Sequence, residues 1–365
     1  MADWSDLPQD LVVCICQRMD SMQDFITFGA VCKTWSSAAT KDNFTHQVPL
    51  LMMPDTEDNN SPFPGQCYNL IKGKVSRLNI PKTITQRRLM PWCRSSLGWL
   101  IIASSRFLTD DSRHIYLLHP FKHEEIVLPT FEFEFGFIKK FVLSSSPSLT
   151  SDYIVMVSTT WSDRKFAFWR PKDNGWTKIS SELNNWESDT RSYDIAYYKG
   201  QFYIVERDGR VLVCDIDDPN KAAAKLVVSE MPNNLVSNDS VQQLYLVESG
   251  GALLLVFRLK NTSRNGFRVF EVPLSTGNWL DAKEVENLGN RALFLTLNNS
   301  SFSIEVSDYS GCKANCIYFA RHLLSECTPT CTDLGIFDMK DGEVEPFTPK
   351  SCRVQQPYVW TQWTF

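Results

Sequence analysis

The chain has 365 residues, of which 43% are hydrophobic and 22% are charged, and its formal net charge is −5. This length is large for a single compact core and indicates two domains or one large repeat architecture. The acidic balance, without long runs of one sign, disfavours a general nucleic-acid binder, because phosphate contacts need a basic surface. The 23 Phe, 11 Tyr and 11 Trp residues favour strands over helices.

The N-terminal residues are acidic where a secretory signal would be basic. The longest early apolar run, residues 11–16, is too short for a signal peptide or a membrane span. We therefore expect a protein of the cytoplasm, the nucleus or both that enters no membrane. In such a reducing compartment the 11 cysteines are expected to be mostly buried thiols.

Residues 7–39 carry apolar side chains at helical spacing. Leu11, Ile15 and Met19 stand four residues apart, with Val12 beside them, which predicts one apolar stripe on a helix. Pro8 suits the first turn of that helix, and two further short helices are predicted before residue 40. Three helices in about 35 residues bury too little apolar area to be stable alone, so they need a partner surface, either the rest of this chain or another protein.

The same segment contains a fairly specific pair of motifs. It opens with Leu7-Pro8-x-Asp10-Leu11, continues through Ile15 and Arg18-Met19, and closes with Phe28-x-x-Val31-Cys32-x-x-Trp35. This pattern resembles an F-box, and departs from it in Met19, where leucine is usual, and in Cys14 and Cys16. Neither change alters volume or polarity enough to forbid the interface of that family.

In F-box proteins the matching positions pack on a small Skp-type adaptor, which links them to a cullin scaffold. The resemblance therefore implies an adaptor-binding face, and its members here are Leu7, Pro8, Leu11, Val12, Ile15, Met19, Phe28, Val31, Cys32 and Trp35. The alternative is an N-terminal helical cap on the rest of the chain, with the same stripe facing inward.

After Phe44 the pattern changes to short β-rich runs separated by turn residues, which is typical of an all-β fold. Grouped in fours, the runs predict five units at spacings of about 45 to 65 residues, near the kelch class of propeller repeat. The predicted strands are 89–94, 99–104, 114–119 and 125–128; 137–143, 153–159, 165–170 and 176–179; 193–198, 201–206, 211–215 and 226–229; 243–248, 252–259, 267–272 and 279–285; 293–297, 315–321, 334–338 and 344–347.

The remaining runs predict a sixth unit closed by both ends of the chain. Residues 48–53, 68–71 and 75–80 supply three strands and residues 358–365 the fourth, which pairs edges that would otherwise be open. We therefore expect a mainly β fold: an F-box over residues 1–44, then a six-bladed kelch-like β-propeller over residues 45–365. A seventh blade follows if residues 301–306 start another. A pair of β-sandwiches is disfavoured, because nothing between the units has the composition of a linker.

Several motifs of this region resemble plant F-box proteins with a kelch-like propeller of the KIB type. The motifs are Phe168-x-Arg170-Pro171 with Trp176-Thr177, Tyr198-Lys199-Gly200-x-Phe202-Tyr203, Leu246-Val247-Glu248-Ser249, Leu288-Gly289-Asn290-Arg291-Ala292-Leu293-Phe294, Cys312-Lys313-x-Asn315-Cys316-Ile317-Tyr318-Phe319 and Gly335-x-Phe337-Asp338. The resemblance implies a non-catalytic receptor subunit of a ubiquitin ligase. In part of that family the target is a protein kinase.

No catalytic motif stands out, and we expect no catalytic residue, cofactor or metal. Nucleophile elbows, phosphate loops, dinucleotide fingerprints and His-Glu-x-x-His helices do not occur. His119 and His123 lie near two glutamates, but their expected place at a strand end and turn predicts solvated side chains. The pairs Cys312/Cys316 and Cys327/Cys331, with His322 between them, are spaced too widely for a zinc ribbon.

The loops from each second strand to each third strand should emerge on one face of the propeller. We hypothesise that this face grips an acidic or phosphorylated target through arginine forks and an aromatic anchor. The residues assigned to it are Arg106, Trp161, Arg164, Arg207 and Arg264. A mixed, solvated rim is the alternative, because acidic residues in the same loops partly cancel the charge.

Two functions thus remain open from the sequence. The chain is either a ligase receptor or a ligand-binding or enzymatic propeller whose N-terminal helices cap it. The helical stripe separates them, because it faces solvent in the first case and packs on the blades in the second.

Overall fold

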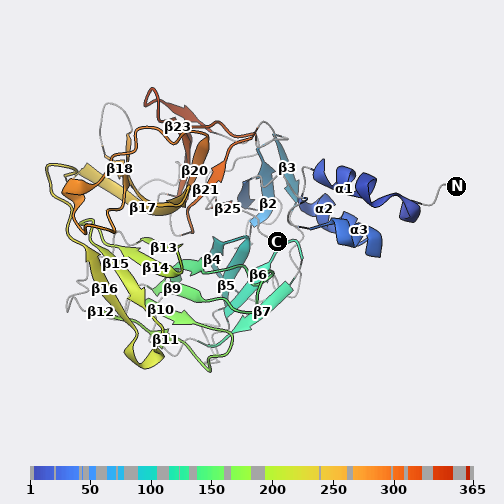
Figure 1. The fold of residues 1–365 in the computed structure, drawn as a ribbon, viewed down its shortest axis with the longest axis horizontal. Helices are drawn as coiled ribbons and strands as arrows, with labels where there is room; N and C mark the ends of the chain where they lie inside the picture. The colour runs from blue at the N-terminus through green and yellow to red at the C-terminus, as the bar shows by residue number, and fades with distance from the viewer. Residues whose placement is uncertain are drawn as a thin grey trace.

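The computed structural model of the chain describes residues 4–19, 22–40, 43, 49–54, 64–70, 73–77, 89–104, 115–122, 124–130, 138–159, 166–181, 194–237, 240–260, 266–296, 299–307, 311–322, 332–347 and 359–361. In this part, three helices precede six β-sheets that stand around a common centre (Figure 1). The fold is therefore the predicted six-bladed propeller with a small helical unit at its N-terminal end. Among the described residues, no helix has the length and apolarity that crossing a bilayer requires.

The first blade joins the two ends of the chain. Its order is β25-β1-β2-β3, with β25 (Val359–Thr361) antiparallel to β1 (Leu50–Pro54), followed by β2 (Pro64–Asn69) and β3 (Lys74–Arg77). Leu51 pairs with Trp360, and both side chains are buried. The predicted closure by both termini is confirmed, because the C-terminal strand β25 pairs with the edge of β1 that would otherwise be open.

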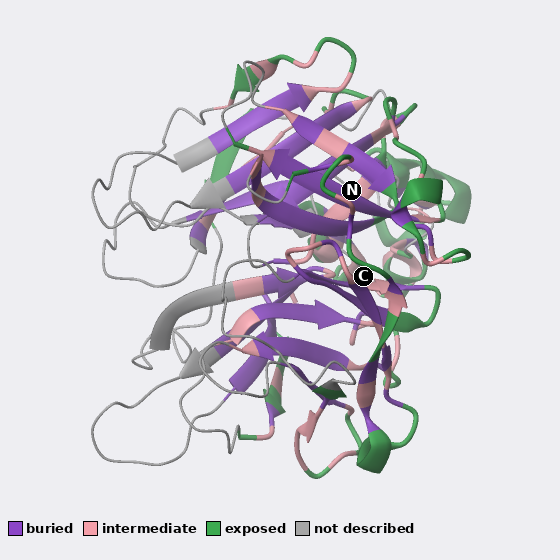
Figure 2. Ribbon diagram, turned by 90° about the vertical axis from the view of Figure 1, so that its left-hand side faces the viewer, coloured by how far each residue is buried: buried purple, intermediate pink, exposed green. Residues whose placement is uncertain are grey.

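The next three blades follow the predicted grouping closely. Their strands are β4 (Leu89–Ser96), β5 (Trp99–Ser104), β6 (Ile115–His119) and β7 (Glu124–Leu128); β8 (Ile138–Leu143), β9 (Val155–Thr159), β10 (Phe166–Trp169) and β11 (Thr177–Lys178); β13 (Asp194–Tyr198), β14 (Gln201–Val205), β15 (Val211–Asp215) and β16 (Ala223–Val228). The short strand β12 (Ser180–Ser181) extends the fourth blade by pairing in parallel with β16. Buried residues run along most strands, whereas exposed ones gather in the turns, on the helices and on strands such as β3 (Figure 2).

The fifth blade has three strands, so the fourth strand predicted over residues 279–285 is wrong. Its strands are β17 (Val241–Ser249), β18 (Ala252–Leu259) and β19 (Phe267–Glu271). Where the fourth was expected, the chain forms a 3₁₀ turn, η5 (Trp279–Asp281), and a single bridge from Glu284 to Phe270. The turn puts the Trp279 indole inside the molecule, where its Nε1 donates to the Gly209 carbonyl at 3.0 Å.

The sixth blade has five strands, and it contains the segment that was considered for a seventh blade. From the inside its order is β21 (Phe302–Glu305), β20 (Arg291–Thr296), β22 (Cys316–His322), β23 (Thr332–Asp338) and β24 (Val344–Pro346). β20 and β22 are parallel, because β21 folds back along β20 before the chain crosses to start β22. Residues 301–306 thus add a strand to the inner edge of the sixth blade and do not start a seventh.

Tight hairpins connect the inner two strands in three blades. The two-residue turns Leu97-Gly98, Lys199-Gly200 and Gly250-Gly251 all have positive φ at both residues. Such turns match the twist of antiparallel strands, and glycine adopts them without strain.

The inner strands form a closed ring around the axis. Neighbouring contacts run from β25 through β4, β8, β13 and β17 to β21, and β20 closes the ring against β25. The sixth blade therefore lies opposite the third. Ser300, just before β21, nevertheless hydrogen-bonds to Ser96 in the second blade and to the Phe141 carbonyl in the third. Asn299 and Ser300 therefore reach from the sixth blade to the inner strands of the second and third blades.

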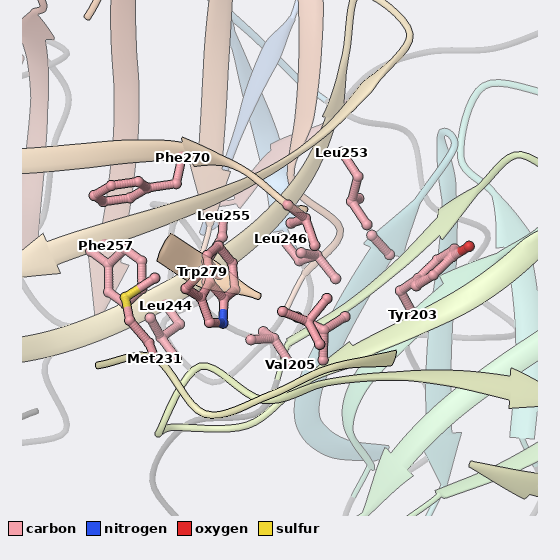
Figure 3. Packing of buried hydrophobic residues seen from close by; sticks show 14 of the residues in the cluster. Tyr203, Val205, Met231, Leu244, Leu246, Leu253, Leu255, Phe257, Phe270 and Trp279 are labelled. Atoms are coloured by element: carbon pink, nitrogen blue, oxygen red, sulfur yellow. The ribbon is translucent and has the colours of Figure 1, made fainter. Parts of the chain in front are cut away.

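Aromatic side chains fasten neighbouring blades together. Trp279 lies among Leu244, Leu255 and Phe257 of the fifth blade and Met231 of the segment that joins the fourth blade to the fifth (Figure 3). Its indole bond to the fourth blade has a counterpart in Trp176, whose Nε1 donates to the carbonyl of Pro129 at 2.9 Å. Each tryptophan precedes or replaces an outer strand, so these contacts secure the rim of the propeller.

Candidate functional site

The helical unit has three short helices that bury apolar side chains. It consists of α1 (Gln9–Gln17), α2 (Met22–Gly29) and α3 (Lys33–Ala38), preceded by the 3₁₀ turn η1 (Trp4–Asp6). Val12, Cys16, Phe25, Phe28 and Ala38 are buried among the helices. Cys16 Sγ donates to the Ala38 carbonyl at 3.4 Å, and burial raises the pKa of this thiol to about 11, so it stays protonated.

This core rests on the propeller. The buried helical residues form one cluster with Leu50, Met52 and Cys67 of the first blade and with side chains of the second blade. In Figure 1 the helices lie outside the ring, beside the blade of β1–β3. The helical unit is thus a lateral extension of the first two blades.

The helices and the turn before them also present large apolar side chains to solvent. The exposed fractions are 67% for Trp4, 48% for Leu11, 38% for Ile15 and 58% for Val31. We call these four residues the apolar face. Only five other large hydrophobic residues in the described part of the chain are comparably exposed, and they are spread over the blades.

Helix α1 is therefore apolar on two sides. Val12 and Cys16 point into the core, whereas Leu11 and Ile15, one turn apart, point to solvent. An amphipathic helix with a single partner surface has one apolar stripe and a polar opposite side. The second stripe of α1 indicates a second partner, which the described part of this chain does not supply.

The predicted adaptor-binding residues divide into three groups. Pro8, Leu11, Ile15 and Val31 are exposed; Leu7, Met19, Cys32 and Trp35 are half-buried; Val12 and Phe28 are buried core residues with 0% and 3% exposure. Spacing alone could not separate Val12 from Leu11, because adjacent residues of a helix point about 100° apart and both apolar stripes include a residue every third or fourth position.

Trp4 is a member of the apolar face that the sequence pattern missed. It precedes the Leu-Pro opening and belongs to η1, so it lay outside the predicted helices. The available signal was the residue itself, a tryptophan three residues before Leu7 in a stretch that is otherwise acidic and polar.

Most of the predicted target-binding residues lie outside the described residues. These are Arg106, Trp161, Arg164 and Arg264. Arg207 is described, and it is half-buried in the turn between β14 and β15. In the same turn Arg210 forms ion pairs with Glu206 at 2.9 Å and with Asp208 at 2.7 Å. The target-binding face stays a prediction.

The expectation of a solvated His119 is wrong. Its side chain is 1% exposed, its Nδ1 accepts a hydrogen bond from the Lys122 amide at 3.1 Å, and its ring meets Trp99 edge-on. In the described ranges, no three His, Cys, Asp or Glu side chains gather as a metal-binding group, and His123, Cys327 and Cys331 lie outside those ranges.

A groove of about 560 Å³ lies between the fifth and sixth blades. Phe267, Val269 and Phe337 line it, together with the oppositely charged Arg268 and Glu284. These two are paired with each other, with Arg268 Nε 2.7 Å from Glu284 Oε1. The groove is therefore lined by both apolar side chains and an ion pair.

The sequence matches two protein families at these two parts of the structure. The F-box domain family matches residues 4–47, and the KIB1-4 β-propeller family matches residues 67–338. F-box protein SKIP23 of Arabidopsis thaliana is 25% identical over 393 residues, which cover 94% of this chain and 91% of that protein. F-box protein At2g17036 of the same plant is 23% identical over 402 residues, covering 94% and 90%.

Similarity to solved structures is weak. The N-terminal domain of Nup159 has 12% sequence identity and a TM-score of 0.31, over 76% of this chain and 69% of that chain. The family match is decisive, because it covers most of the propeller and, in the same order, the helical unit. The chain belongs to the F-box proteins that carry a KIB1-4 β-propeller.

Proposed function

We propose that this chain is the substrate-recognition subunit of a ubiquitin ligase of the Skp–cullin–F-box type. The apolar face carries the proposal, because Leu11, Ile15 and Val31 stay exposed although the helical unit already packs on the first two blades. An F-box implies a Skp-type adaptor as the partner for such a face, and through it a cullin.

The way the helices join the propeller fits this role. Their core is continuous with buried residues of the first two blades, so an adaptor bound to the apolar face holds the propeller in a fixed place. A target on the propeller then has its lysines near the conjugating enzyme at high effective concentration. In this proposal the chain has no reaction of its own.

The competing function is a ligand-binding or enzymatic propeller capped by the helices. A cap would turn its apolar stripe toward the blades, and Leu11 and Ile15 support the receptor because they are turned to solvent.

The proposed target is a protein that is acidic, phosphorylated or a protein kinase. The chain is proposed to bind it in the cytoplasm or the nucleus. One variant changes the four arginines to glutamate and the tryptophan to alanine, at Arg106, Arg164, Arg207, Arg264 and Trp161. This variant should no longer bind the target. Retained target binding in that variant would remove this part of the proposal.

The proposal is tested by adaptor binding of the intact chain and two matched variants. Ile15→Asp puts a charge on the apolar face, and Leu280→Asp puts the same charge on an exposed apolar residue of the fifth blade. The two positions are 38% and 63% exposed, so neither change disturbs a buried core. Affinity for a purified Skp-type adaptor is measured by calorimetry.

We expect the unchanged chain and Leu280→Asp to bind alike and Ile15→Asp to lose binding, because a charge buried without a partner opposes association. Equal binding by all three proteins would show that the adaptor uses another surface. Absence of binding by the unchanged chain would contradict the ligase role altogether.

A further inference from the structure

The 3₁₀ turn η1 is tied to the third helix through a tryptophan. Trp35 Nε1 donates to the backbone carbonyl of Trp4 at 3.3 Å. The Trp35 ring meanwhile stacks on Phe28, with centroids 4.5 Å apart and an interplanar angle of 28°. The ring face of Trp35 thus belongs to the helical core, while its edge fixes the turn that precedes α1.

The side chain held by this turn points away from the core. Trp4 is 67% exposed, more than any other large hydrophobic residue in the described part of the chain. A tryptophan on a backbone that is already fastened loses little conformational entropy when a partner covers it. Tryptophan is also the residue type most enriched among the anchors of protein interfaces.

The place of Trp4 in the chain indicates which partner covers it. Trp4 precedes Leu11 by seven residues, and the half-buried Leu7 lies between them in the chain. η1 leads into α1 with only two connecting residues, so the exposed Trp4 adjoins, along the chain, the helix that carries the exposed Leu11 and Ile15. This continuity along the chain makes the occupant of the apolar face the occupant of Trp4 as well.

We propose that Trp4 is an anchor residue for the Skp-type adaptor and that Trp35 positions it by fastening η1. This inference rests on the proposed function. It assigns Trp35 a task different from direct contact with the adaptor, and it adds to the interface a residue outside the Leu-Pro motif.

Four proteins test both parts: the intact chain, Trp4→Ala, Trp35→Phe and the double variant, each titrated with purified Skp-type adaptor. Trp4→Ala keeps the backbone carbonyl that Trp35 holds and removes only the anchor. Trp35→Phe keeps a ring for stacking on Phe28 and removes only the N–H donor. We expect Trp4→Ala to weaken binding about 30-fold, as truncation of an interface anchor does.

The double variant separates positioning from contact. If Trp35 acts through Trp4, then Trp35→Phe weakens binding in the intact chain and has no further effect once Trp4 is alanine. Trp4→Phe should recover most of the affinity, and the melting temperature of Trp4→Ala should match that of the intact chain. Independent, multiplying losses in the double variant would overturn the positioning role.

The failures of the two proposals differ. Unchanged affinity in Trp4→Ala, with binding abolished in Leu11→Asp, would overturn the anchor and leave the ligase role standing. A lowered melting temperature of Trp4→Ala with unchanged affinity would also overturn it, because Trp4 would then pack on its own chain. No adaptor binding by the intact chain would overturn both.

Discussion

Ser300 Oγ donates a hydrogen bond to the Phe141 carbonyl at 3.1 Å, although the two residues belong to opposite blades of the ring. The same hydroxyl is 3.0 Å from Ser96 Oγ, which in turn accepts from the Leu143 amide at 3.0 Å. The propeller is therefore held together across its axis as well as around its circumference.

Removing the side chain of Asn299, which precedes Ser300, should lower the free energy of unfolding. Asn299 Oδ1 accepts from the Ser95 amide at 2.7 Å, and both residues are buried. Asn299→Ala leaves that amide without its acceptor, at a cost of about 1–3 kcal/mol in the free energy of unfolding. Urea denaturation checks this against Asn220→Ala in an exposed turn, which should change stability by less than about 0.5 kcal/mol. Equal stability of the two variants would mean that the hydrogen bond between Asn299 and Ser95 does not stabilise the fold.

A second connection between blades involves opposite charges. The buried Lys140 of β8 pairs with Asp194 of β13, and Asp194 Oδ2 also accepts from the Leu246 amide of β17 at 2.7 Å. Lys140→Met and Asp194→Asn alone should each cost about 3–5 kcal/mol, because one buried charge remains. The double variant should be more stable than Asp194→Asn alone. A double variant less stable than both singles would show that the charges themselves contribute little.

Trp279 should be the most sensitive residue at the rim. It is 1% exposed and packs between the fourth and fifth blades, so Trp279→Ala should cost about 3–5 kcal/mol. Trp279→Phe keeps much of the packing and loses the bond to the Gly209 carbonyl, which is worth about 1–3 kcal/mol. The neighbouring Leu280 is 63% exposed, and its alanine variant should be neutral. Thermal unfolding of the three variants should follow that order, and a neutral Trp279→Ala would contradict the packing described.

Cys214 predicts a loss of stability at alkaline pH. Burial raises the pKa of its thiol from 9.0 to about 12. Between these values the folded protein keeps a proton that the unfolded chain releases, so the thiol's contribution is complete below pH 9 and is lost as the pH rises toward 12. At a pH of about 10.5 the loss is about 2 kcal/mol. Cys214→Val should therefore lose less stability between pH 8 and that pH in urea titrations, and an identical loss would contradict the burial of this thiol.

The sequence was sufficient for the parts of the fold that repeat. Alternating apolar runs bounded by glycine turns, such as the one at Lys199-Gly200, placed most strands within a few residues. It was insufficient where one side chain decided the backbone. Residues 279–285 have the composition of a strand, but the Trp279 indole donates to the carbonyl of Gly209, 70 residues away, and the chain forms a 3₁₀ turn at that tryptophan.

The sequence also could not predict which sheet a given strand joins. Residues 302–305 alternate as a strand does, but their local sequence does not indicate that they pair with the inner edge of β20 instead of starting a new blade. For the site, the motif located the helical unit, whereas only the packing of Cys16 on Ala38 shows which side of α1 is free. Helical periodicity gives the apolar positions and not the partner that covers each of them.

The most direct test of the receptor role is hydrogen exchange of the intact chain with and without a Skp-type adaptor. Docking on the apolar face should slow exchange in α1 and in the turn at Val31, and leave the strands of blades three to six unchanged. Protection confined to the blades, or no protection anywhere at saturating adaptor, would contradict the assignment of this chain as an adaptor-bound receptor.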